Sequence, residues 1–206
     1  MRLAAMLDDD LQFIARHLDA KGVRARVEPL LCFGACAVWC CVSRILFVSG
    51  SRALDRTTAA RAWAIDILQR AFAWWRPALL VHGGCEDCPD TWADDIAYHD
   101  DIPTLVFLRD GGVVPSGEIP KCVTFRATRW TSDEHLLSHP PRRRPLMRNE
   151  EMVRVLSEEV GDAEVLCVGL GAPWSERHGT EHTVGLARAS RRMRVEYRLC
   201  PAEFGP

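Results

Sequence analysis

Short apolar runs recur through residues 44–200, each bounded by glycine, proline or charged residues. A run of four to eight residues with such boundaries is typical of a buried strand. We predict five strands on this basis, over residues 45–49, 79–82, 104–108, 165–168 and 193–197. Runs such as ILFVS at 45–49 do not alternate with polar residues, which favours a sheet covered on both faces.

Helical periodicity fills the intervals between these runs. One long helix is indicated by apolar residues close to helical spacing: Ala60, Trp63, Ile67, Phe72 and Trp75. Asp55 or Thr57 could cap this helix, and Pro77 ends it. Further helices are predicted over residues 91–98, 147–160 and 183–190. Strands that alternate with helices predict an α/β fold with a Rossmann-like parallel sheet flanked by helices.

The remaining segments lack a clear period. We predict a turn-rich insertion at 109–120, a short strand at 123–125, and proline- and glycine-rich loops at 130–146 and 169–179. Residues 1–43 precede the alternation, and we interpret them as an appendage made of a helix and a cysteine-rich apolar segment. The domain organisation is therefore an appendage over 1–43, a domain over 44–200 and a tail over 201–206.

Composition narrows the class of protein. The chain has 206 residues, of which 48% are hydrophobic and 26% charged, as in an ordinary globular protein. The net charge of −2 gives no global basic field for nucleic acid. The nine cysteines form no regular framework, and we find no secretory signal, so we expect reduced thiols and a cytoplasmic location. The apolar run at 30–42 is shorter than the ~20 residues that span a membrane, so we expect no membrane contact.

Loops that follow parallel strands are the expected place for a ligand, because ligands bind beyond the carboxyl ends of such strands. The first loop is Gly50-Ser51-Arg52, in which serine and arginine could bind a phosphate oxygen. The second is His82-Gly83-Gly84-Cys85, with Asp90 at the start of the next helix. Free backbone N–H groups in this second loop would form an anion site.

A third loop of the same kind is Gly179-Thr180-Glu181-His182, where the chain enters a helix. Thr180 could cap the helix and contact a phosphate. Glu181 and His182 are candidates for acid and base. Both could equally be solvent-facing residues of a first helical turn.

Five short motifs occur in an order that suggests a known family. They are 45–52 (ILFVSGSR), 80–90 (LVHGGCEDCPD), Trp130, 148–152 (RNEEM) and 179–184 (GTEHTV). Together they resemble the YspA-like branch of the SLOG superfamily, the group with DUF2493 domains. Related branches are the LOG phosphoribohydrolases and the Smf/DprA DNA-processing proteins. The resemblance covers roughly residues 44–200.

This resemblance implies a Rossmann-like domain that binds a nucleotide or a nucleotide-derived ligand. Carried over by position, the ligand-binding residues are Gly50, Ser51, Arg52, Gly83, Gly84, Asp90, Arg148, Asn149, Gly179 and Thr180, and the loop adds Cys85. The resemblance to LOG-type proteins also suggests a homodimer. We expect a binding or sensing domain first, because the glutamate of the LOG pattern has no counterpart at the matching position; Glu181 lies one residue too early.

Two other functions stay open. A nucleotide N-glycosidic hydrolase would use Glu181 and Asp90, with His182 as an alternative acid. Single-stranded DNA binding would use Arg142, Arg143 and Arg144, although the near-neutral charge makes nucleic acid a weaker candidate partner.

The pair Cys85 and Cys88 has rival interpretations. Its place between a strand and a helix is similar to a thioredoxin redox site, but Pro103 follows too soon for the intervening elements of that fold. Zinc could use His82, Cys85 and Cys88, completed by His99 or Cys122. Because a second C-x-x-C pair is missing, we expect no metal and no cofactor.

Overall fold

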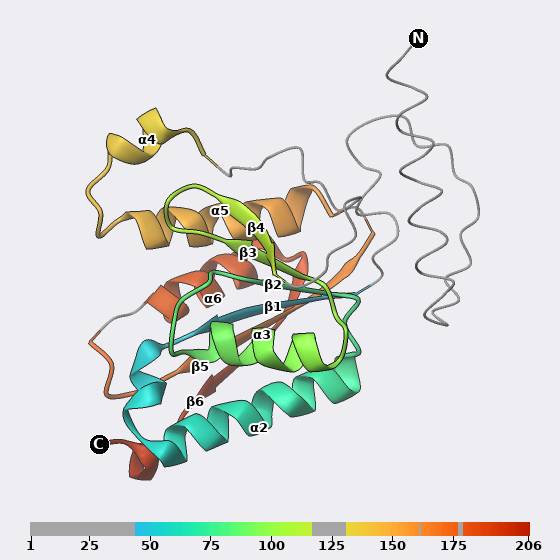
Figure 1. Cartoon of the computed structure of the whole chain (residues 1–206), viewed down its shortest axis with the longest axis vertical. Helices are drawn as coiled ribbons and strands as arrows, with labels where there is room; N and C mark the ends of the chain where they lie inside the picture. The colour runs from blue at the N-terminus through green and yellow to red at the C-terminus, as the bar shows by residue number, and fades with distance from the viewer. Residues whose placement is uncertain (1–43, 117–130, 161, 177–178) are drawn as a thin grey trace, which may run out of the picture.

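The computed structural model describes residues 44–116, 131–160, 162–176 and 179–206, and all structural statements below concern these residues (Figure 1). A six-stranded sheet has the order β4-β3-β2-β1-β5-β6. Its strands are β1 (Arg44–Gly50), β2 (Leu79–His82), β3 (Thr104–Phe107), β4 (Val113–Ser116), β5 (Glu164–Gly171) and β6 (Met193–Leu199). All neighbours pair in parallel except β3 and β4. The five predicted strands and the Rossmann-like α/β fold are confirmed.

Helices cover both faces of the sheet. The α-helices are α2 (Thr58–Trp75), α3 (Pro89–His99), α4 (Asp133–Leu137), α5 (Arg144–Glu158) and α6 (Gly179–Ser190), and short 3₁₀ helices are η2 (Arg52–Arg56) and η3 (Ala202–Phe204). Figure 1 shows α2 and α3 on one side of the sheet and α5 and α6 on the other. The predicted cap of the long helix is Thr57, whose hydroxyl accepts a hydrogen bond from the Ala60 N–H.

Two hydrophobic cores result, one on each face. Leu46 and Val48 of β1 belong to the core beneath α2 and α3, whereas Ile45 and Phe47 belong to the core beneath α5 and α6. Successive side chains of a strand point to opposite faces, so every position of a central strand must be apolar. This explains the continuous apolar run at 45–49. Each such side chain, once buried, stabilises the fold by roughly 1.5–3 kcal/mol.

The predicted insertion at 109–120 is partly wrong, because β4 lies within it. Leu108 and Gly112 pair through the backbone, and Gly111 has a φ of 93°, so the chain reverses there and β4 runs antiparallel to β3. Pro115 argues against a strand in the middle of a sheet, since proline donates no ladder hydrogen bond. It is tolerated on an edge strand, and β4 is one.

The predicted loops at 130–146 and 169–179 are also too long. Ser132 caps α4 by accepting a hydrogen bond from the His135 N–H, and α5 already begins at Arg144. Pro145 lies in the first turn of α5, where a missing N–H is harmless. On the other side, β5 continues to Gly171 and α6 begins at Gly179. The predicted strand at 123–125 and the appendage over 1–43 lie outside the described residues.

The last residues pack against the domain. Thr57 donates a hydrogen bond to the carbonyl oxygen of Phe204, and the Trp174 indole N–H donates to the carbonyl oxygen of Ala53 at 3.2 Å. Trp174 and Phe204 both contact the core beneath α2 and α3. The segment that we separated as a tail therefore closes one end of this core. Among the described helices, none is both long enough and apolar enough to cross a membrane.

Candidate functional site

The sheet has its topological switch point between β1 and β5. The chain proceeds from β1 to β2 and β3 on one side, and from β5 to β6 on the other. The Ser51 N–H donates to the carbonyl oxygen of Leu170 at 2.9 Å, which joins the ends of β1 and β5. This carboxyl edge, where the parallel strands end, is where the fold is expected to bind a ligand.

The loop after β1 is held close to the start of α3. A Cβ atom on Gly50 would lie 2.2 Å from the ring of Pro89, so only glycine permits this approach. Ser51 is buried, and its hydroxyl accepts a hydrogen bond from the Ala53 N–H at 3.3 Å. The serine thus caps η2, while Arg52 is exposed to solvent.

The loop after β2 corrects one prediction. Its backbone N–H groups are not free, because the protein supplies their acceptors. Oδ2 of Asp90 accepts hydrogen bonds from the N–H groups of Gly83 at 3.2 Å and Cys85 at 3.4 Å. The Gly84 N–H donates to Nδ1 of His82 at 3.0 Å. An anion cannot use these groups unless the loop rearranges.

Arg148 lies directly over this loop. It belongs to the first turns of α5 and is only 6% exposed. Its Nη1 donates to the carbonyl oxygen of Gly83, and its Nε and Nη2 donate to Oδ1 of Asn149 at 3.1 and 2.8 Å. A Cβ atom on Gly83 would lie 2.4 Å from the guanidinium carbon, so the missing side chain at Gly83 is what makes room for Arg148.

Asn149 extends this network to the start of α6. Its Nδ2 donates to Oγ1 of Thr183 at 2.7 Å, and Thr183 in turn donates to the carbonyl oxygen of Gly179 at 2.8 Å. Thr180 is buried. The structure therefore connects the loop after β2 with the starts of α3, α5 and α6. Thr183 was missed from the sequence because one hydroxyl in a helix carries no distinctive pattern.

Glu181 and His182, the two acid–base candidates of α6, have partners outside the network around Arg148. Oε1 of Glu181 accepts a hydrogen bond from the Tyr197 hydroxyl of β6 at 2.8 Å. Burial raises the pKa of Tyr197, and the bond to Glu181 raises it further. His182 lies at the surface, with its Nε2 3.3 Å from Oε1 of Glu150.

Glu181 and Asp90 are therefore anchored at different places along the sheet. Tyr197 belongs to β6, and the Asp90 carboxylate is bound at the end of β2. These strands are three positions apart in the sheet. The Tyr197 hydroxyl reaches from β6 over β5, since a Cβ atom on Gly171 would lie 2.4 Å from it. Glu181 and Asp90 are thus bound by different partners at different places along the carboxyl edge.

Cys85 and Cys88 form a coupled pair beside Asp90. Cys88 is fully buried at the N-cap of α3, and its thiol lies 3.1 Å from the carbonyl oxygen of Cys85. A hydrogen bond from Cys88 lowers the pKa of Cys85 to about 6, against the opposing effects of burial and of Asp90. Arg148 and Arg52 lower this pKa further through their charges. Both arginines therefore act electrostatically on the same loop.

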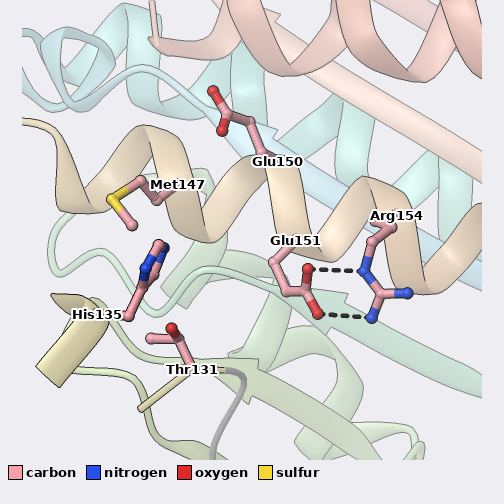
Figure 2. A pocket seen from close by; sticks show the side chains of 6 residues that line it. All are labelled: Thr131, His135, Met147, Glu150, Glu151 and Arg154. Carbon is pink, nitrogen blue, oxygen red and sulfur yellow. Dashed lines mark hydrogen bonds and ion pairs between the residues drawn. The ribbon is translucent and has the colours of Figure 1, made fainter. Parts of the chain in front are cut away.

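Two hollows lie elsewhere on the described surface. One, of about 350 Å³, lies between α4 and α5. Figure 2 shows His135 facing Met147 in this hollow, and the ion pair between Glu151 and Arg154. The other, of about 540 Å³, lies between α2 and β6 and includes Trp63, Trp74 and Arg198. Neither is lined by the three predicted loops. Those predicted ligand-binding residues that lie close together, such as Gly83 and Arg148, pack tightly against each other.

No protein-family model, curated protein or solved structure matches this chain. The resemblance to the SLOG superfamily stays a prediction, and what the site can do is inferred below from its own geometry and charge.

Proposed function

We propose that this domain binds a nucleotide or a nucleotide-derived ligand at its carboxyl edge, with an anionic group of the ligand at Arg148. One observation carries the proposal. Arg148 is a buried guanidinium that forms no ion pair among the described residues, since its hydrogen-bond acceptors are a carbonyl and an amide. Buried charges in proteins are normally paired, so an external anion would supply what this cation lacks.

The donor count of Arg148 supports the same conclusion. A guanidinium has five N–H groups in a planar fork. Three are used, one each on Nε, Nη1 and Nη2. The two that remain belong to the terminal nitrogens, and a pair of terminal N–H groups is what binds a phosphate in a bidentate manner.

The surroundings favour an anion as well. Arg52 adds a second positive charge at the neighbouring loop, and its side chain is exposed and able to reorient. The site lies at the carboxyl edge of a Rossmann-like sheet, over the end of β2 and next to the switch point between β1 and β5, and this edge is the usual place for a nucleotide in this fold class. Because Arg148 covers Gly83, we expect ligand entry to move the guanidinium away from the Gly83 carbonyl while Asn149 holds its other edge.

A binding function is favoured over N-glycosidic hydrolysis. Carboxylates that cooperate in glycosidic cleavage lie about 5–9.5 Å apart. In this protein each carboxylate already has a partner of its own: Asp90 binds the backbone N–H groups of Gly83 and Cys85, and Glu181 binds the Tyr197 hydroxyl over β5. Release of free base from a mononucleotide, abolished by Glu181→Gln, would establish the hydrolase instead.

The direct test is calorimetric titration with a panel of adenosine, guanosine, cytidine and uridine mono- and diphosphates, alongside inorganic phosphate. We expect at least one nucleotide to bind. Arg148→Met should then weaken its binding about 10- to 100-fold, which corresponds to the roughly 1.5–3 kcal/mol of a hydrogen bond to a charged group.

Arg143→Ala is the matched control, because Arg143 is exposed and immediately precedes the first residue of the same helix. It should leave nucleotide affinity unchanged. Equal losses in the two variants would indicate a general effect of positive charge. Absence of binding across the whole panel would remove the proposal. If Arg143→Ala instead reduced affinity for single-stranded DNA, in a strongly salt-dependent manner, the nucleic-acid alternative would gain support.

A further inference from the structure

We propose that Cys85, Cys88 and Asp90 form a binding site for a zinc ion at the start of α3. One ligand atom from each residue, two sulfurs and a carboxylate oxygen, lies within 4.8 Å of the others. This site goes beyond nucleotide binding and does not depend on it. It also differs from the set considered from the sequence, because Asp90 takes the place expected for His82.

The spacing of the three atoms suits a tetrahedral ion. Zinc binds sulfur at about 2.3 Å and carboxylate oxygen at about 2.0–2.2 Å, so ligand atoms of one tetrahedral site lie roughly 3.3–3.8 Å apart. Small rotations of the side chains would bring atoms within 4.8 Å to that separation. Cys88 and Asp90 are fixed by the first turn of α3, while Cys85 is half-buried in the loop and leaves the site reachable from solvent.

A second, independent observation comes from Asp90. This side chain is 4% exposed, and its Oδ1 is buried without a hydrogen-bond partner. Its other oxygen is held by the N–H groups of Gly83 and Cys85. A buried carboxylate oxygen without a partner is costly, and a metal ion would satisfy it. Backbone bonds to the non-ligating oxygen are the kind of support that orients a metal-binding carboxylate.

His82 is used in another way. Its Nδ1 accepts a hydrogen bond from the Gly84 N–H, and its Nε2 lies 3.6 Å from Oδ1 of Asp94. Neither nitrogen belongs to the cluster of possible ligand atoms. The imidazole therefore shapes the loop and is not a ligand in the proposed site.

The donor set and the local charge both favour zinc. Thiolates select zinc over magnesium and calcium, which prefer oxygen ligands. Two thiolates and one carboxylate would surround Zn²⁺ with a net charge of −1, and Arg148 and Arg52 lie within electrostatic reach of Cys85. Binding forms two Zn–S bonds and one Zn–O bond in place of bonds from the ion to water, and any proton still held by either thiol leaves to solvent. Three protein ligands leave a fourth position for water.

The test uses the full chain, reduced and stripped of metal, titrated first with cobalt(II) and then with zinc in competition with a chromophoric chelator. Cobalt should give a thiolate-to-metal charge-transfer absorption that zinc abolishes. Because the chain holds nine cysteines, the decisive comparison is with Cys85→Ser/Cys88→Ser. This variant should bind one metal ion fewer per chain. Equal stoichiometry in the two proteins would overturn the proposal.

Asp90→Asn sharpens the result. Asparagine keeps one oxygen for the two backbone N–H groups and replaces the other with an amide nitrogen, which is a poor ligand. Removing even an outer-shell partner costs about 10- to 100-fold in metal affinity, so the loss here should be at least that large, with the charge-transfer absorption retained. Cys200→Ala, which alters a buried cysteine outside the cluster, should bind as the wild type does. Wild-type affinity in Asp90→Asn would exclude Asp90 as a ligand and overturn the site as proposed.

The zinc site and the nucleotide site can fail separately. Arg148→Met should weaken nucleotide binding about 10- to 100-fold and leave the metal stoichiometry unchanged. A protein that binds nucleotide but takes up no zinc would refute only the metal site, and the converse would refute only the proposed function.

Discussion

Polar side chains at two parts of the carboxyl edge are used in different ways. Around the end of β2, Asp90, Arg148 and Asn149 are each at most 6% exposed. Asp90 and Arg148 bind backbone groups of Gly83, and Asn149 joins Arg148 to Thr183. We call this set the Gly83 network. It joins the loop after β2 to α3, α5 and α6 through hydrogen bonds that are mostly buried.

At the first turn of α6 the situation is reversed. His182 lies at the surface, and its partner Glu150 is also exposed. Glu181 accepts a hydrogen bond from the Tyr197 hydroxyl of β6 and binds no residue of the Gly83 loop in the contacts described above. At the His182–Glu150 pair water can substitute for a lost partner, which makes this contact weak.

The difference indicates where function resides in this molecule. A ligand that binds an exposed ion pair has to compete with water, whereas one that binds the Gly83 network meets charges already desolvated by folding. Substitutions in the Gly83 network should therefore reduce stability as well as binding. Substitutions in the first turn of α6 should do neither to a large degree.

The largest effect is expected for Asp90→Ala. The change leaves the N–H groups of Gly83 and Cys85 without an acceptor, and each buried unsatisfied group costs about 1–3 kcal/mol. We expect the free energy of unfolding of the metal-free protein, measured with urea, to fall by about 2–4 kcal/mol. Asp90→Asn retains one oxygen and should lose clearly less. A loss below about 1 kcal/mol for the alanine variant would show that water reaches these groups.

Asn149→Ala should come next. It removes the acceptor of two Arg148 N–H groups and the donor to Thr183, with an expected loss of about 1–3 kcal/mol in urea unfolding. Thr183→Val removes only the far end of the same chain and should cost less. In a double-mutant cycle the two changes should be non-additive, because they share a hydrogen bond. Strict additivity would mean that the network does not act as a unit.

Much of this arrangement follows from the sequence, for reasons that can be stated. The strands were predictable because residues such as Ile45 and Phe47 must be apolar on both faces of a covered sheet. The meeting of the loops followed from a general rule, that parallel strands end at one edge. The missed elements are α4, β4 and the start of α5. At the last two, Pro115 and Pro145 suggested loops. Proline is tolerated at a sheet edge and in a first helical turn, and sequence alone does not tell these places from true loops.

The internal use of the Gly83 loop could not be predicted in the same way. The sequence placed Asp90 seven residues after Gly83, near enough to meet it. It did not show that the carboxylate turns back onto the backbone N–H groups and occupies the place predicted for an anion. That outcome depends on where the start of α3 lies relative to the strand ends, and the close packing of Pro89 against Gly50 is part of this arrangement. Such an arrangement is a property of tertiary packing and has no local signature.

Tyr197→Phe tests the hydrogen bond between Tyr197 and Glu181, the stronger of the two contacts described for the first turn of α6. Loss of the hydrogen bond to Glu181 should cost about 0.5–1.5 kcal/mol in urea unfolding at neutral pH. The raised pKa of Tyr197 adds a check at high pH. The unfolded chain releases this proton at a pH near 10, so the tyrosine stabilises the fold below that pH and the contribution is lost as the pH rises towards the folded value. The wild type should therefore show, above pH 10, a tyrosinate absorbance that Tyr197→Phe lacks. Titration of Tyr197 at or below pH 10 would contradict the burial of this hydroxyl.

The smallest effect is expected for His182→Ala, and it decides whether the two parts of the edge really differ. The pair of His182 with Glu150 is exposed to solvent on both sides, so its loss should change the free energy of unfolding by no more than about 0.5 kcal/mol. Nucleotide affinity should also stay within about twofold of the wild type, since Arg148 and Gly83 are untouched. Glu150→Gln is the matched change on the partner helix and should behave in the same way. A tenfold loss of affinity in His182→Ala would place this histidine in contact with the ligand, and the binding site would then extend from the end of β2 across the sheet to the start of α6.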